Sequence, residues 1–138
     1  MRFSLRFVRS CAASPEIIYD LLAVPERWPQ WLTSARTARW EVPGTVRRIE
    51  VSGLTMREQI LVADRPHHHA YTILSGFPVT DHRADVRITP RPDGCVVTWE
   101  ATFRSRVPGT GALVWLMLRS SMPTMVRALV RGAEAQRS

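Results

Sequence analysis

Three side chains that can exchange protons with a ligand, Glu58, Tyr71 and His82, lie in stretches where apolar and polar residues alternate. Successive residues of a strand point to opposite faces, so each of the three should share a face with the apolar residues two positions away. A carboxylate, a phenol and an imidazole at one end of a cavity could bind or protonate a ligand carbonyl. We therefore take these three as the candidate catalytic residues.

A second interpretation of Glu58 stays open at the sequence level. A carboxylate that faces the interior needs a partner, and Arg47 or Arg57 could supply one. Glu58 would then be half of a structural ion pair. A one-residue bulge in its strand would also move it to the opposite face.

Alternation and helical spacing extend the set of side chains that should face a cavity. Two tryptophans follow the first helical segment and could fill the core, wall the cavity, or do both. The residues expected to line the cavity on these grounds are Trp28, Trp31, Met56, Glu58, His69, Tyr71, Ile73, His82, Ala84, Trp99, Trp115, Met122 and Met125.

Other chemistries have little support in the sequence. Of the three histidines 67–69, only His67 and His69 could point the same way, and their side chains would stand about 7 Å apart along a strand. Cys11 and Cys95 form no CxxC motif, so we expect reduced thiols, and no GxSxG motif indicates a nucleophile. We expect neither a metal nor another cofactor.

The elements that must position these side chains can be followed along the chain. Residues 2–9 alternate as a half-buried strand does. Ser14 can cap a helix that starts at Pro15, and prolines 25 and 29 keep a second helical piece short. Turn signals then divide residues 36–106 into six short segments typical of strands. A long helix is predicted from Thr110 to Arg137, with a kink near Pro123.

This order of elements predicts an α+β fold, in which an antiparallel meander is closed by the first strand and the long helix lies across its concave face. A straight helix does not fill a strongly curved sheet. The sequence therefore predicts a cavity between sheet and helix.

Five motifs carry a resemblance to a known superfamily. They are Ala-Ser-Pro-Glu-Ile-Ile-Tyr-Asp at 13–20, Pro-Glu-Arg-Trp-Pro-Gln-Trp at 25–31, Gly-Thr-Val-Arg-Arg at 44–48, Asp64-Arg65-Pro66 leading to Tyr71, and Asp93-Gly94 leading to Trp99. The chain resembles the START-like (SRPBCC) superfamily of polyketide cyclase/dehydrase and lipid-transport proteins over essentially its whole length. The resemblance implies a helix-grip fold: a curved seven-stranded antiparallel sheet wrapped around a long C-terminal helix, with two short helices between strands 1 and 2. Residues 1–138 would form one ligand-binding domain.

Two turns, Ser-Gly-Leu-Thr at 52–55 and Ser-Gly-Phe-Pro at 75–78, resemble the loops that close over the hormone in plant abscisic-acid receptors. The resemblance implies a cavity entrance there and adds Leu54 and Phe77 to the lining residues. The receptors' buried lysine has no lysine counterpart here, so hormone sensing is not implied.

Composition limits the partners. The chain has 138 residues, a length that fits one domain, and its 19 basic residues are all arginines spread from Arg2 to Arg137. This spread argues against a nucleic-acid surface.

The longest apolar run, 112–118, is far shorter than the roughly 20 residues of a membrane span. No leader is recognised, so we expect a cytoplasmic protein without an integral membrane segment. The apolar first half of the last helix could line the cavity, form a homodimer contact or touch a membrane surface.

Three hypotheses for function follow. The leading one is a small intracellular protein that binds a hydrophobic molecule, aromatic, polyketide-like or lipid-like, in the cavity. The second is an aromatase/cyclase-like enzyme that acts on a poly-β-keto substrate by acid/base catalysis. The third is an interaction domain with a vestigial pocket.

Overall fold

The protein is described by a computed structural model, and the description covers residues 1–136. Along the chain, one strand and two short helices come before six consecutive strands, and one long helix follows them, as the sequence predicts. The elements are β1 (Phe3–Cys11), α1 (Pro15–Ala23), the 3-10 turn η1 (Pro25–Arg27), α2 (Trp28–Trp31), β2 (Ala35–Val42), β3 (Val46–Val51), β4 (Leu54–Asp64), β5 (His68–Ser75), β6 (Val79–Arg91), β7 (Gly94–Ser105) and α3 (Gly111–Gln136).

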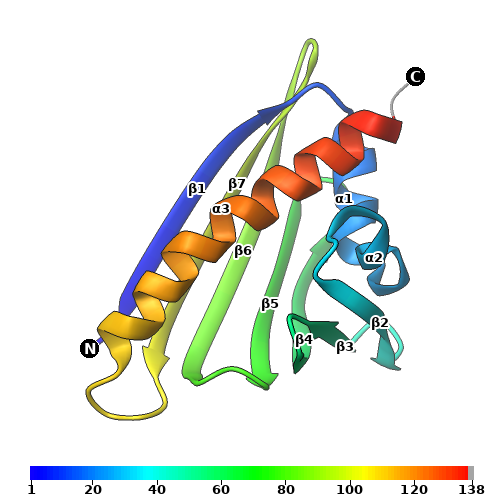
Figure 1. Ribbon diagram of the computed structural model, residues 1–138. Coiled ribbons are helices and arrows are strands. Elements are labelled where there is room, and N and C mark those ends of the chain that lie inside the picture. The colour runs from blue at the N-terminus through cyan, green and yellow to red at the C-terminus, as the bar shows by residue number, and fades with distance from the viewer. Residues whose placement is uncertain (137–138) are drawn as a thin grey trace.

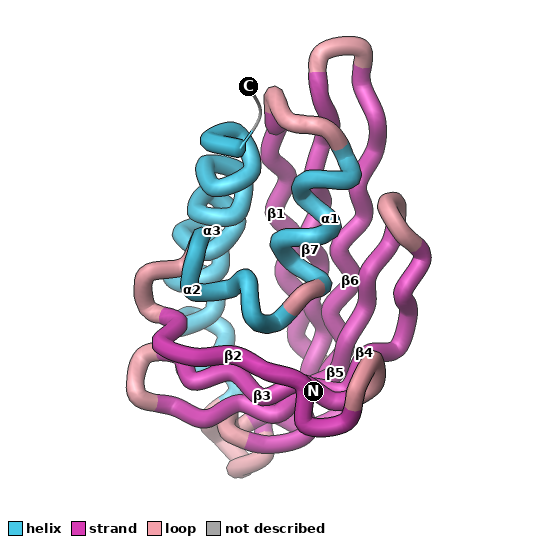
Figure 2. Tube along the Cα trace, turned by 90° about the vertical axis from the view of Figure 1, so that its right-hand side faces the viewer, coloured by secondary structure: helices cyan, strands magenta, loops and turns pink. Residues whose placement is uncertain are grey.

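The strands form one antiparallel sheet in the order β1-β7-β6-β5-β4-β3-β2. Strand β1 pairs with β7 without a register shift, so the first and last strands of the chain are neighbours. The sheet is strongly curved: β2 and β3 run beneath the molecule, steeply inclined to β6 and β7 (Figure 2). Helix α3 crosses in front of the sheet on a diagonal (Figure 1). The predicted α+β arrangement is confirmed.

Helix α3 has buried residues along its whole length, and it contacts β1, α1 and α2. Its buried residues are Gly111, Val114, Met122, Val126, Leu129, Val130 and Ala133. Trp115 and Met125, which the sequence predicts to line the cavity, are only partly buried, as is Leu118. The Trp115 indole instead donates a hydrogen bond to the Ser4 carbonyl of β1, at 3.1 Å.

The long helix continues through Pro123, and the predicted kink there stays a prediction. Helix α3 ends at Gln136, so the predicted extension to Arg137 lies outside the described residues. Within residues 1–136 no helix is both long enough and apolar enough to span a bilayer.

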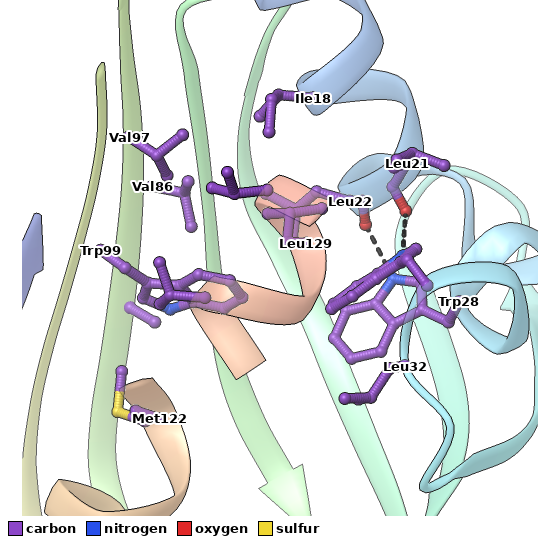
Figure 3. Close-up of a cluster of buried hydrophobic side chains, with 14 of the residues drawn as sticks. Ile18, Leu21, Leu22, Trp28, Leu32, Val86, Val97, Trp99, Met122 and Leu129 are labelled. Atoms are coloured by element: carbon purple, nitrogen blue, oxygen red, sulfur yellow. Dashed lines mark hydrogen bonds between the residues drawn. The ribbon is translucent and has the colours of Figure 1, made fainter. Parts of the chain in front are cut away.

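Two tryptophan indoles complete the C-terminal turn of α1. The last carbonyls of a helix have no partner inside the helix. Here the Trp28 indole N–H donates to the Leu22 carbonyl and the Trp31 indole N–H to the Leu21 carbonyl, both at 2.9 Å (Figure 3). Ser14 caps the other end of α1 by accepting from the Ile17 N–H at 3.4 Å, as predicted. These contacts fix both tryptophans against the C-terminal end of α1.

Candidate functional site

A cavity of about 470 Å³ lies between the concave face of the sheet and the middle of α3. Strands β3 to β7, the α2 region and α3 all contribute side chains to its wall. The lining residues are Trp28, Leu32, Ser34, Ile49, Val51, Ser52, Leu54, Met56, Glu58, Tyr71, Ile73, Phe77, His82, Ala101, Met117, Leu118, Ser121, Met122, Thr124 and Met125. The wall is mostly apolar, with a few polar groups.

The structure brings ten of the predicted lining residues to this cavity: Trp28, Leu54, Met56, Glu58, Tyr71, Ile73, Phe77, His82, Met122 and Met125. It places the other five elsewhere. Trp31, His69, Ala84 and Trp99 are buried in the protein interior, and Trp115 packs over β1. Trp99 and Leu129 of α3 belong to the same cluster of buried hydrophobic side chains (Figure 3). Alternation predicts which face of a strand a residue occupies but not its position along the strand, which is why His69, Ala84 and Trp99 were grouped with the lining residues.

Nine further lining residues were missed: Leu32, Ser34, Ile49, Val51, Ala101, Met117, Leu118, Ser121 and Thr124. Ser52 also lines the cavity and belongs to a turn that was expected at the entrance. The missed residues on α3 carried a usable signal. Leu118 and Ser121 precede Met122 and Met125 by four residues each, so they share one side of the helix with them.

Glu58 is paired with Arg47 inside the protein. The Arg47 Nε donates to the Glu58 Oε1 at 2.8 Å, and the two side chains are 0% and 5% exposed. The Arg47 guanidinium also lies 5.0 Å from the ring centres of both Trp28 and Tyr71. Of the two arginines that the sequence offered as partners, the structure selects Arg47, and Arg57 instead pairs with Glu41 at the surface.

Arg47 also connects the sheet to the tryptophan wall. Its Nη1 donates to the Leu22 carbonyl at 2.9 Å, the same oxygen that accepts from the Trp28 indole. One carbonyl of α1 therefore fixes both a cavity wall and the buried guanidinium. The Arg47 Nη2 has no hydrogen-bond partner among residues 1–136.

The environment shifts the pKa values of the acidic groups in the cavity. Burial raises the pKa of Glu58, and the Arg47 charge and hydrogen bond oppose that rise. Burial, followed by the Glu58 charge, raises the pKa of Tyr71. Tyr71 is therefore a neutral phenol at neutral pH, and the Glu58 carboxylate is already engaged by a cation.

His82 is held in one tautomer by the backbone of β5. The Ile73 N–H donates to the His82 Nδ1 at 3.1 Å, so the neutral ring carries its proton on Nε2. Burial lowers the pKa of His82 to about 4, which keeps the ring neutral at neutral pH. The ring centre lies 5.9 Å from that of Tyr71. The three candidate catalytic residues thus line one cavity, with Tyr71 between the other two.

The two turns expected at the entrance meet each other. Leu54, which is 44% exposed, Ser52 and Phe77 all line the cavity. Gly76 has a φ of +97°, and a Cβ there would lie 2.1 Å from the Thr55 carbonyl oxygen. The β5–β6 turn therefore packs directly on the start of β4, a contact that only glycine permits.

The histidine run and the cysteines lie away from the cavity. His68 pairs with Asp85 at 2.7 Å, and His69 is buried beside Tyr19. Residues 1–136 contain no group of three or more His, Cys, Asp or Glu side chains that could hold a metal ion. Cys11 and Cys95 face each other across β1 and β7.

Sequence comparison places this architecture in a family. The profile described as "Polyketide cyclase / dehydrase and lipid transport" matches residues 2–136. The chain belongs to this family. An uncharacterized protein of Mycobacterium tuberculosis is 25% identical to this family member over 128 residues, which cover 87% of this chain and 75% of that protein.

Solved structures share the fold at low sequence identity. A START superfamily protein from Mycobacterium smegmatis superposes with a TM-score of 0.81 and 17% identity, covering 97% of this chain and 99% of that one. Norcoclaurine synthase from Thalictrum flavum, solved with dopamine and hydroxybenzaldehyde, gives 0.75 and 16%, with 100% and 90% covered. The di-domain aromatase/cyclase BexL gives 0.77 and 18%, with 97% of this chain and 49% of that chain covered. These likenesses confirm the helix-grip fold of the START-like superfamily.

Proposed function

We propose that the protein binds a hydrophobic small molecule, aromatic, polyketide-like or lipid-like, in the cavity between the sheet and α3. The observation that carries this proposal is the cavity of about 470 Å³, whose wall is mostly apolar but includes Glu58, Tyr71 and His82. Enclosed apolar cavities with a few convergent polar groups are typical of small-molecule sites. Membership of the family supports the same function.

The test uses N-phenyl-1-naphthylamine, an uncharged probe whose fluorescence rises in apolar surroundings. Ser121 lines the cavity although its side chain is exposed, so Ser121→Trp should obstruct the cavity without disturbing the core. Ser120 is exposed and does not line the cavity, which makes Ser120→Trp the matched control. We expect saturable binding to the wild type and to Ser120→Trp, and binding at least about tenfold weaker to Ser121→Trp.

Two outcomes would contradict binding in this cavity. The first is a lack of saturable binding by the wild type. The second is equal affinity in the two tryptophan variants, which would place the probe elsewhere. Either result would favour the third hypothesis, an interaction domain with a vestigial pocket.

A second candidate function is acid/base catalysis of an aromatase/cyclase type. The specific observation in its favour is that three groups able to exchange protons line one cavity, with Tyr71 and His82 ring centres 5.9 Å apart. The Arg47–Glu58 pair counts against Glu58 as a free base. Incubation with a synthetic poly-β-keto thioester, followed by mass spectrometry, tests it: cyclised, dehydrated product must form faster with the wild type than with Tyr71→Phe.

We propose a cytoplasmic protein in which residues 1–138 form one ligand-binding domain. A homodimer contact is supported by Leu113, Leu116 and Met117 on α3, which are 61%, 54% and 49% exposed. Light scattering after size-exclusion chromatography measures the mass in solution, and a monomeric mass at all concentrations would exclude the homodimer.

A further inference from the structure

We propose that the cavity selects uncharged ligands that carry a hydrogen-bond-accepting oxygen, which the Nε2–H of His82 binds, and that it rejects carboxylates and phosphates of similar shape. This inference rests on the proposed function, because it assumes that the cavity holds a small molecule. Within the ligands of the proposed function, it selects those that carry no net charge and that accept a hydrogen bond from His82.

The charge selection follows from where the arginines are. The chain carries 19 of them and a formal net charge of +7, yet none of those within residues 1–136 belongs to the cavity lining. In the described part of the chain, the buried guanidinium beside the site is that of Arg47, and its charge is matched by Glu58 at 2.8 Å. Its Nη2 has no hydrogen-bond partner there, but Arg47 does not line the cavity. A bound anion would lose its water and gain no unmatched cation, and it would also meet the Glu58 carboxylate. Burial of such a charge is strongly unfavourable.

A cationic ligand is disfavoured for a related reason. The Glu58 carboxylate is the negative group in the lining, and the Arg47 guanidinium offsets its charge. An ammonium group would therefore have to compete with a guanidinium that is also bound to the Leu22 carbonyl and packed between two aromatic rings. An uncharged ligand avoids both penalties.

The polar contact follows from the hydrogen bond that fixes His82. The Ile73 N–H occupies the His82 Nδ1, so the ring has one donor left, Nε2–H. His82 belongs to the cavity lining, and its low pKa keeps that donor uncharged at neutral pH. An imidazole in this state matches a carbonyl, ether or hydroxyl oxygen. It gives a carboxylate no compensating positive charge.

Three naphthalenes of nearly equal shape test the inference. 2-Acetonaphthone carries a neutral carbonyl, 2-isopropenylnaphthalene replaces that oxygen by carbon, and 2-naphthoate carries an anion. Dissociation constants at neutral pH are measured by calorimetry on the full chain. We expect 2-acetonaphthone to bind about three- to tenfold tighter than 2-isopropenylnaphthalene, as one neutral hydrogen bond provides. 2-Naphthoate should bind at least about tenfold more weakly than 2-acetonaphthone.

Variants of His82 assign the contact. His82→Phe removes the donor and should abolish the preference for 2-acetonaphthone over 2-isopropenylnaphthalene. His82→Gln keeps an N–H donor and should retain part of that preference. Circular dichroism and melting curves establish that each variant is folded. If His82→Phe does not fold, the wild-type affinity ratios still decide the inference.

The results that would overturn this ligand selectivity differ from those that would overturn ligand binding in the cavity. Equal or tighter binding of 2-naphthoate would overturn the charge selection, and equal binding of the two neutral compounds would overturn the role of His82. If N-phenyl-1-naphthylamine binds in the cavity but 2-acetonaphthone does not, the inference is wrong while the proposed function stands. If no compound binds, including N-phenyl-1-naphthylamine, the proposed function itself fails.

Discussion

Arg47 is a buried arginine that contacts four other residues of the protein interior. Its guanidinium binds Glu58 and the Leu22 carbonyl and lies 5.0 Å from the ring centres of Trp28 and Tyr71. Desolvating both ions is costly, and removal of one partner leaves the other charge buried and unmatched. We therefore expect removal of one charge, of Arg47 or of Glu58, to destabilise the fold more than removal of both.

This dependence predicts the outcome of a double-mutant cycle. Glu58→Leu should lower the free energy of unfolding by about 3–5 kcal/mol, because it strands the Arg47 charge. Arg47→Met combined with Glu58→Leu should recover most of that loss. Urea unfolding measures both. Arg57→Met is the surface control and should cost much less than Glu58→Leu, since its pair with Glu41 lies at the surface and is accessible to solvent. Additive effects of the two buried substitutions would contradict the coupling.

His69 is a buried histidine without a partner for its Nδ1 among residues 1–136. Its side chain is 1% exposed, and burial, aided by the charges of Arg47 and His68, lowers its pKa from 6.5 to about 3. The unfolded chain therefore takes up this proton at a higher pH than the folded protein. The resulting stability is complete above about pH 6.5 and is lost as the pH falls toward about 3.

His69→Phe should reduce the sensitivity of the protein to acid. Between neutral pH and pH 4 the wild type should lose about 3 kcal/mol more of its free energy of unfolding than the variant does. Urea unfolding at the two pH values measures this difference, and the contribution of His82 is common to both proteins. An equal loss in the wild type and the variant would contradict the assignment of the acid sensitivity to His69.

At the scale of elements, Gly132 controls how closely α3 approaches α2. A Cβ at this position would lie 2.6 Å from the Trp31 Cβ. Gly132→Ala should therefore destabilise the protein by about 1–3 kcal/mol through overpacking, although alanine normally favours a helix over glycine by about 1 kcal/mol. Thermal unfolding measures the effect. Ser120→Ala, at an exposed position of the same helix, should leave stability nearly unchanged or raise it slightly. A stabilising Gly132→Ala would show that the two helices can separate at no cost.

The elements themselves could be predicted from the sequence because their signals are local. Ser14 and Pro15 mark the start of α1, and glycine or proline turns separate the six strands from β2 to β7. Alternation also gave the correct face for Glu58 and His82, which are both buried. This holds although the pairing of β4 with β5 has one register shift just before Glu58 and another just after Ile60. Those shifts did not turn Glu58 outward.

The position of a residue along its strand could not be predicted in the same way. His69 and Tyr71 share a face of β5, yet Tyr71 lines the cavity and His69 lies in the packed interior near α1. That difference depends on where α1 and α3 cross the sheet, which is set by long-range packing. The choice of Arg47 over Arg57 as the partner of Glu58 was likewise fixed by cross-strand register, since Arg47 is directly opposite Glu58.

At the scale of the whole molecule, binding in the cavity should stabilise the fold. A ligand that binds only the folded state adds about 2.7 kcal/mol at a concentration one hundred times its dissociation constant. For a chain of this length we expect the melting midpoint to rise by about 10 °C. Scanning calorimetry with increasing N-phenyl-1-naphthylamine measures this rise. Ser121→Trp, which should bind the probe at least about tenfold more weakly, should show a clearly smaller rise at the same probe concentrations. An equal rise in that variant would contradict binding in the cavity.

Helix α3 lines the cavity with one part of its length and packs into the protein core with another. Its middle section, with Leu118, Ser121 and Met125, faces the cavity, whereas Leu129 and Ala133 are fully buried further along. Substitutions in the middle section can alter cavity shape with little effect on the packing that holds the helix in place, and methionine adapts readily to such changes. Evolution could therefore change what the protein holds without first rebuilding the scaffold. Relatives with the same backbone would then diverge fastest at these middle positions of the helix.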